Sequence, residues 1–158
     1  MSLNLPAINQ PAPLFATQNQ HGEIVNLSDF LGKKVVLYFY PKAMTPGCTT
    51  QACGIRDSRD DFNAVNTVVL GVSPDAPERL QKFIERDDLN FDLLSDENHQ
   101  IAEQYGVWGL KKFMGKEYDG VHRISFIIDE QGVLRHIMDK VATKTHHQDV
   151  LELIKTMP

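Results

Sequence analysis

Two cysteines are the residues with the clearest chemical potential in this sequence. Cys48 and Cys53 both lie in the stretch YPKAMTPGCTTQACGIRD, residues 40–57, and they are the two cysteines of the chain. On one helix, five residues correspond to about 140° of rotation and about 7.5 Å of rise, which places the Cα atoms roughly 8–9 Å apart. A disulfide needs Cα atoms within about 7 Å, so these thiols can bond only if the helix unwinds locally. The spacing fits a disulfide that forms after one sulfur has been oxidised better than it fits a structural staple.

The residues around Cys48 predict a reactive thiolate at the start of a helix. Thr45 suits the N-cap and Pro46 the first helical position, so Cys48 becomes the third helical residue. A cysteine there lies at the positive end of the helix dipole, where thiol pKa values are lowered. We expect the Thr45 hydroxyl to accept a hydrogen bond from the Cys48 backbone N–H, and Gly47 to leave room for a small substrate. The Cys48 sulfur should then be exposed, and burial in the apolar interior would contradict this interpretation.

Other interpretations of the two cysteines are open at this point. Cysteine is among the most buried residue types, so Cys53 fits an ordinary core position equally well. A thiol–disulfide oxidoreductase normally separates its cysteines by two residues, whereas four residues separate them here. A metal-binding module could use two soft thiolates, but helical spacing turns the sulfurs apart. A redox sensor would use the same oxidation as an enzyme, and the sequence does not distinguish the two.

The composition is that of an ordinary globular protein. The chain has 158 residues, of which 42% are hydrophobic and 23% charged, and its formal net charge is −5. This length fits one domain, 1–158, and the negative charge gives no support for nucleic-acid binding. The longest apolar runs, 35–40 and 124–128, are too short to cross a membrane, and the first residues lack the pattern of a signal peptide. We therefore expect a cytoplasmic protein whose thiols are kept reduced.

Hydrophobic periodicity predicts an alternation of strands and helices. Residues 14–27 have the pattern of a β-hairpin, and three apolar segments, 33–40, 66–74 and 121–129, predict long buried strands. The remaining predicted elements are helices over 45–62, 76–88, 98–107 and 143–157 and strands over 91–96 and 133–139. This order is that of a thioredoxin-like α/β three-layer sandwich with a central mixed β-sheet and an N-terminal β-hairpin extension.

Several residues outside the cysteine segment receive structural interpretations. The expected roles are core packing for Tyr38 and Tyr40, packing within a loop for Trp108, helix capping for Ser28, and solvent exposure for His146, His147 and a loop over 113–120. A lone histidine or tyrosine among apolar neighbours is more often structural than catalytic. None of these positions changes the chemistry expected of the cysteines.

The segment PKAMTPGC resembles the active-site pattern of the peroxiredoxins, in which a proline, a threonine and a cysteine recur at fixed spacing. Here the three positions are Pro41, Thr45 and Cys48. The second cysteine, five positions later, resembles the subgroup called peroxiredoxin Q or bacterioferritin comigratory protein. The stretches LLSDENHQIAEQYGVWG and FMGKEYDGVHRISFIID are similar to the same subgroup, so the resemblance extends over residues 6–157.

The resemblance implies a thiol-dependent peroxidase of thioredoxin-like fold that needs neither a metal nor an organic cofactor. Cys48 matches the peroxidatic cysteine and Cys53 the resolving cysteine. Thr45 matches the hydroxyl that orients the thiolate and the peroxide, Pro41 the residue that shields the site from water, and Arg123 the arginine near the thiolate. The implied substrates are hydrogen peroxide and organic hydroperoxides, and the implied reductant is thioredoxin. A monomer or weak homodimer is expected.

The chemistry implied by the resemblance assigns a task to each of these groups. The Cys48 thiolate would attack one peroxide oxygen in line with the O–O bond, and Arg123 would stabilise the charge that spreads over the oxygens. The backbone N–H groups of Gly47 and Cys48 would supply further donors. The product would be a sulfenic acid, which Cys53 converts to a disulfide. This chain has Gln51 where many relatives have a glutamate, so a proton relay through that position is not assumed.

Overall fold

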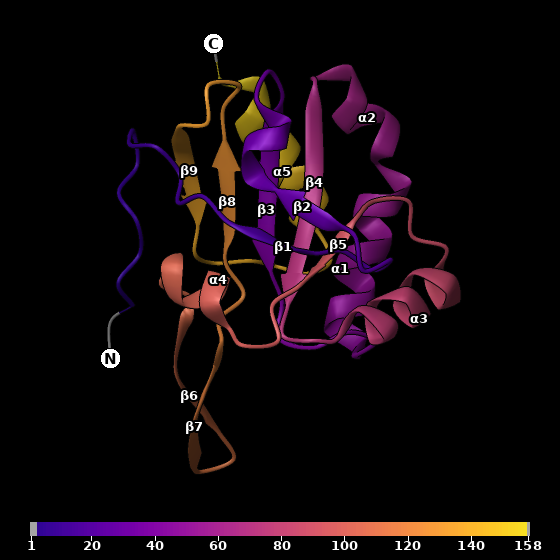
Figure 1. Cartoon of the computed structure of the whole chain (residues 1–158), viewed down its shortest axis with the longest axis vertical. Coiled ribbons are helices and arrows are strands. Elements are labelled where there is room, and N and C mark those ends of the chain that lie inside the picture. The colour runs from indigo at the N-terminus through magenta and orange to yellow at the C-terminus, as the bar shows by residue number, and fades with distance from the viewer. Residues whose placement is uncertain (1–2, 158) are drawn as a thin grey trace.

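The computed structural model describes residues 3–157, except for the side chain of Phe113. Figure 1 shows the arrangement of its strands and helices. The elements are β1 (Ala16–Gln18), β2 (Ile24–Asn26), the 3-10 helix η1 (Leu27–Phe30), β3 (Lys34–Phe39), α1 (Pro46–Asp57), α2 (Arg59–Ala64), β4 (Thr67–Ser73), α3 (Pro77–Asp87), β5 (Leu93–Ser95), α4 (Gln100–Gln104), β6 (Trp108–Phe113), β7 (Lys116–Val121), β8 (Ser125–Ile128), β9 (Leu134–Met138) and α5 (His146–Lys155).

A five-stranded mixed sheet forms the centre, in the order β5-β4-β3-β8-β9. The strand pairs β3–β4 and β4–β5 are parallel, whereas β3–β8 and β8–β9 are antiparallel. The central strand β3 is buried on both faces, as its nearly continuous apolar sequence predicts. The predicted mixed sheet and the separate N-terminal hairpin β1–β2 are both confirmed.

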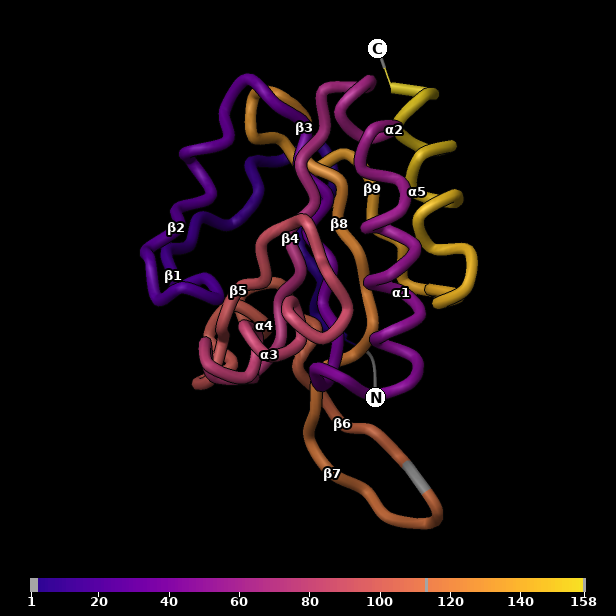
Figure 2. Tube along the Cα trace, turned by 90° about the vertical axis from the view of Figure 1, so that its right-hand side faces the viewer, coloured from indigo at the N-terminus to yellow at the C-terminus, as the bar shows by residue number. Residues whose placement is uncertain are grey.

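The two faces of the sheet are covered by different elements, which makes the predicted three layers. Helices α1, α2 and α5 lie along one face, and the β1–β2 hairpin with α4 lies on the other (Figure 2). Successive side chains of β3 point to opposite faces, so Leu37 and Phe39 join the core on the hairpin side. Tyr38 joins the core beneath α1 and α5, where the predicted packing role of Tyr38 and Tyr40 is confirmed.

The hairpin β6–β7 extends away from the rest of the molecule (Figure 2). The predicted exposure of this segment is confirmed for residues 114–119. The predicted loop is wrong, because all of 113–120 except the turn at 114–115 belongs to paired antiparallel strands. Met114 and Gly115 connect the strands with φ angles of 52° and 79°, as expected for a two-residue hairpin turn. Such turns usually have asparagine or aspartate before the glycine, whereas this one has methionine, so the sequence did not clearly predict a hairpin here.

The long strand predicted over 121–129 is interrupted. Strand β7 ends at Val121 and β8 begins at Ser125. Arg123 therefore lies in the connection between the protruding hairpin and the central sheet, rather than within a strand. Two contacts of His122 close the base of the hairpin: its backbone N–H donates to the Val107 carbonyl at 2.8 Å, and its Nε2 lies 3.1 Å from the Leu110 carbonyl.

The predicted helix caps were partly right. Thr145 occupies the N-cap of α5, within the helix predicted over 143–157. The cap predicted at Ser28 is wrong, because Asn26 is the N-cap of η1 and its backbone N–H donates to the Asp29 carboxylate at 3.1 Å. Over residues 3–157, none of the helices is both long and apolar enough to cross a membrane.

Candidate active site

Helix α1 carries both cysteines. It begins at Pro46, with Thr45 at the N-cap in an extended conformation, so Cys48 is the third helical residue as predicted. Both thiols are free. Because the helix is continuous from Pro46 to Asp57, the spacing argument applies to the folded chain: Cys48 and Cys53 can form a disulfide only after α1 opens.

The hydrogen bond predicted for the Thr45 side chain is wrong. Its hydroxyl donates to the Lys42 carbonyl oxygen at 3.0 Å and makes no capping bond to the helix. The loop before α1 turns back so that this carbonyl comes within reach of the hydroxyl. The first backbone N–H groups of a helix have no intrahelical acceptor, so those of Gly47 and Cys48 stay available as donors.

The prediction that Cys48 is exposed is also wrong. The residue is 2% exposed and belongs to the core cluster that includes Tyr38, Tyr40 and Ala52. The sequence placed Cys48 at a helix terminus correctly, but could not show that the sheet and Arg123 cover that terminus. The enclosure is not wholly apolar, because the Arg123 guanidinium contacts the sulfur. The buried sulfur therefore has a charged hydrogen-bond donor within reach.

Arg123 lies directly against the Cys48 thiol. Its Nη2 donates to Cys48 Sγ at 3.4 Å, and its Nη1 donates to Gln51 Oε1 at 2.7 Å. A Cβ atom built on Gly47 would lie 3.5 Å from Nη2, so the glycine backbone borders the same guanidinium. One planar group therefore bridges the first two turns of α1 and presents its positive charge to the sulfur.

Gln51 positions Arg123 without neutralising it. The Gln51 side chain is fully buried, and its Oε1 is a neutral acceptor for the guanidinium. No described carboxylate forms an ion pair with Arg123. A glutamate in place of Gln51 would neutralise part of the positive charge of Arg123, whereas the neutral amide leaves that charge facing the Cys48 sulfur.

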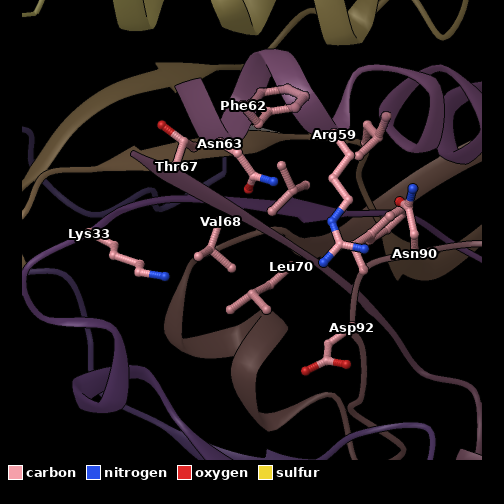
Figure 3. A pocket seen from close by; sticks show the side chains of 12 residues that line it. Lys33, Arg59, Phe62, Asn63, Thr67, Val68, Leu70, Asn90 and Asp92 are labelled. Carbon is pink, nitrogen blue, oxygen red and sulfur yellow. The ribbon is translucent and has the colours of Figure 1, made fainter. Parts of the chain in front are cut away.

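An open cavity leads to Arg123 from the surface. It has a volume of about 500 Å³, and its lining residues are Leu3, Leu5, His122, Arg123, Ile124 and Asp139. A different cavity, of about 280 Å³, lies between α2 and β4, where Arg59 extends across it (Figure 3). Neither cysteine lines either cavity, but the first is bordered by Arg123, whose guanidinium contacts the Cys48 sulfur.

Residues 8–137 match the model of the AhpC/TSA family. The chain belongs to this family. The match covers most of the chain, including both cysteines and Arg123, and the peroxiredoxin identity expected from the PKAMTPGC segment is confirmed.

Individual peroxiredoxins match over nearly their whole length. The chain is 57% identical over 144 residues to peroxiredoxin Bcp of Escherichia coli, covering 91% of this chain and 92% of that one. It is 49% identical over 150 residues to peroxiredoxin Bcp of Bacillus subtilis, covering 95% and 96%. The solved bacterioferritin comigratory protein of Xanthomonas campestris superposes with a TM-score of 0.85 at 28% identity, covering 97% and 96%. The chain is thus a thiol-dependent peroxidase with the thioredoxin-like fold predicted.

The loop before the peroxiredoxin helix is held by a buried aspartate that the sequence interpretation missed. Asp75 Oδ2 accepts the Ala43 backbone N–H and the Ser73 hydroxyl, both at 2.7 Å. Arg79 donates to the Ala43 carbonyl at 3.0 Å, so both backbone groups of Ala43 are bound. Pro41, half-buried, lies between this anchor and the end of β3. The bonds of Asp75 and Arg79 to Ala43 therefore fix the position of the loop that leads into the start of α1.

Lys111 is a second cation near the peroxiredoxin site, also missed from the sequence. Its half-buried side chain folds back along β6–β7, and Nζ donates to the Val121 carbonyl at 2.9 Å. Its stem passes over Gly120, where a Cβ atom would lie 3.1 Å from the lysine Cδ. Burial lowers the pKa of Lys111, and the charge of Arg123 lowers it further while Cys48 opposes this.

Cys53 lies in a different environment from Cys48. Its side chain is half-buried. Burial raises the pKa of the Cys53 thiol above its ordinary value; Arg56 opposes this shift, while the carboxylates of Asp87 and Asp57 add to it. Cys53 is therefore a protonated thiol at neutral pH, which disfavours it as the group that attacks peroxide first.

The prediction that His146 is solvated is wrong. It is 1% exposed, its Nε2 lies 2.7 Å from Ser125 Oγ, and its ring lies 5.5 Å from that of Tyr38. Burial lowers the pKa of His146 to about 4; His147 and Arg123 lower it further, and Asp149 opposes them. His146 was expected to be exposed because it lies at the start of a helix, but the first turn of α5 packs on α1 and β8.

Acid should destabilise the protein through His146. The unfolded chain binds this proton below about pH 6.5, whereas the folded chain binds it only near pH 4. Stability is therefore lost as the pH falls from 6.5 towards 4. Relative to His146→Asn, the wild type should lose about 2.5 kcal/mol more unfolding free energy between pH 7 and pH 4.5, measured by urea denaturation. The exposed His21→Asn control should follow the wild type, and equal pH dependence in all three would contradict the assignment.

Proposed function

We propose that Cys48 is the peroxidatic cysteine of this peroxiredoxin. Its thiolate attacks the nearer oxygen of a hydroperoxide, a sulfur–oxygen bond forms, and the O–O bond breaks. The departing oxygen takes a proton and leaves as water or an alcohol, while Cys48 becomes a sulfenic acid. The observation that carries this proposal is the contact of Arg123 with Cys48 Sγ at the amino-terminal end of α1.

The groups around Cys48 are suited to stabilising the transition state. Negative charge moves from sulfur to the departing oxygen, so a donor that reaches both positions lowers the barrier. The guanidinium of Arg123 is a planar fork of donors, and the N–H groups of Gly47 and Cys48 point out of the helix start. The Thr45 hydroxyl donates its proton to the Lys42 carbonyl, and its oxygen can still accept a hydrogen bond from a hydroperoxide, which is how we propose that it orients that substrate.

We assign Cys53 as the resolving cysteine. After α1 opens, the Cys53 sulfur attacks the sulfenic sulfur of Cys48, and the hydroxyl leaves as water with the thiol proton. An intramolecular disulfide results, and a dithiol protein such as thioredoxin, in a reducing compartment such as the cytoplasm, returns both cysteines to thiols. The related Xanthomonas campestris structure is described in terms of alkyl peroxide reduction, which supports organic hydroperoxides as substrates beside hydrogen peroxide.

Trapping of the first intermediate tests this assignment. A Cys53→Ser variant treated with equimolar hydrogen peroxide and dimedone should carry the dimedone adduct on Cys48, identified by peptide mass spectrometry. Wild-type protein should instead lose two hydrogens and yield a linked Cys48–Cys53 peptide. The proposal fails if dimedone labels Cys53 in wild type, or if the Cys53→Ser variant leaves the peroxide unreacted.

A further inference from the structure

Arg86, on α3, is bonded to the chain on both sides of Cys48. Its Nη2 donates to Thr49 Oγ1 at 2.7 Å, and its Nη1 lies 3.5 Å from the Met44 carbonyl oxygen, a weaker contact. Met44 precedes α1, and Thr49 lies in its first turn. The guanidinium therefore ties α3 to the segment that delivers the peroxidatic sulfur.

The Arg86 side chain is held in place by its own helix. Its Nε donates to the neighbouring Asp87 carboxylate at 2.8 Å, and its guanidinium carbon lies 5.8 Å from the centre of the Phe83 ring. Phe83 is fully buried, so the stem of Arg86 rests on a fixed surface. Because the guanidinium is already oriented, its bonds to Thr49 and Met44 lose little side-chain freedom when they form.

The bonds of Arg86 differ in position from those that anchor the preceding loop. Asp75 and Arg79 bind Ala43, upstream of α1, and these bonds can persist while the helix unwinds. The bond to Thr49 cannot persist, because Thr49 moves with the first turn. Met44, between the two sets, has a φ of 66°, a left-handed conformation that is unfavourable for a non-glycine residue. Opening of the turn can release that strain, and Arg86 opposes the release.

We propose that Arg86 is a positioning residue that sets how readily the first turn of α1 opens. The inference rests on the proposed roles of Cys48 and Cys53. While the turn is closed, the sulfenic acid on Cys48 cannot reach Cys53 and can instead meet a second hydroperoxide. That reaction transfers one oxygen to sulfur, giving a sulfinic acid and releasing water or an alcohol. By holding the turn closed, Arg86 slows resolution and favours this overoxidation.

An Arg86→Met variant tests the proposal. Methionine retains packing on Phe83 but removes the donors to Thr49 and Met44, together with the bond to the neighbouring Asp87. The ratio of disulfide formation to sulfinic acid formation, measured by rapid quenching and mass spectrometry at several peroxide concentrations, should rise about fivefold, as expected for the loss of one solvent-exposed hydrogen bond. Thr49→Val should raise the ratio less, and adding it to Arg86→Met should change little. Lys82→Met, on an exposed position of the same helix, should match the wild type.

Amide exchange separates this proposal from the proposed function. In the reduced protein without peroxide, exchange over residues 47–52 should quicken about fivefold in Arg86→Met and remain unchanged in Lys82→Met. If peroxide fails to oxidise Cys48, the proposed function fails, yet the exchange measurement still tests the contact. If amide exchange is unchanged in Arg86→Met, Arg86 does not position the first turn of α1. If exchange is faster but the ratio of disulfide to sulfinic acid is unchanged, Arg86 does not influence the competition between Cys53 and peroxide.

Discussion

A Cys48→Ser variant is expected to lose peroxide turnover by about 10³-fold or more. A serine hydroxyl stays protonated at neutral pH, even beside Arg123, and an alcohol cannot form the sulfenic acid on which the cycle depends. The measurement is steady-state consumption of hydrogen peroxide with reduced thioredoxin as the electron source. Because the substitution changes one buried atom, the far-ultraviolet circular dichroism and the thermal midpoint should stay close to those of the wild type.

Cys53→Ser is the matched control for that experiment. It removes the other thiol of the same helix, yet a burst of about one equivalent of peroxide should still be consumed, because Cys48 reacts before Cys53 is needed. Recycling by thioredoxin should then slow, since no intramolecular disulfide forms. If Cys48→Ser retained the turnover and Cys53→Ser lacked the burst, the roles assigned to the two cysteines would have to be exchanged.

Replacing Arg123 by methionine should lower the second-order rate constant for peroxide about 100-fold, equivalent to about 2.7 kcal/mol of transition-state stabilisation. The substitution removes the charged donor that contacts Cys48 Sγ and the bond that fixes Gln51. Both losses act on the same chemical step, before the helix opens. Stopped-flow mixing of the reduced enzyme with excess peroxide gives that rate constant without interference from the reductant.

Two further substitutions make the Arg123 prediction specific. Arg123→Lys keeps the positive charge but loses the planar fork, so it should recover only part of the rate. Arg135→Met removes a different arginine, which pairs with Asp129 at 2.8 Å, and should react like the wild type. A methionine variant as fast as the wild type would show that the close contact with Cys48 has no part in the chemistry.

Short stretches of sequence correctly predicted the central strand β3 and the start of helix α1. The apolar run of β3 and the Thr45–Pro46 start of α1 both appear where they were expected. The resemblance of the PKAMTPGC segment then identified the family before any geometry was known. These predictions succeed because strand burial and helix initiation depend on residues within one or two turns of each other.

The surroundings of the site could not be predicted in the same way. Arg123 meets Cys48 across 75 residues of sequence, and Asp75 meets Ala43 across 32. The burial of Cys48 and of His146 depends on how α1 and α5 pack on the sheet, which no local pattern encodes. The Thr45 hydroxyl illustrates the limit most directly: its position in the chain was predicted, but its hydrogen-bond partner was decided by the path of the loop.

The β6–β7 hairpin divides into an inner and an outer half with different tolerance to change. At the inner end, His122 closes the strands beside Arg123, so an altered side chain there would displace the guanidinium. At the outer end, Met114 is 87% exposed, in the tight turn that joins β6 to β7, and the hairpin projects away from the central sheet (Figure 2). Fluorophores, epitope tags or short insertions are best attached at that tip, where they can report on this enzyme without entering its chemistry.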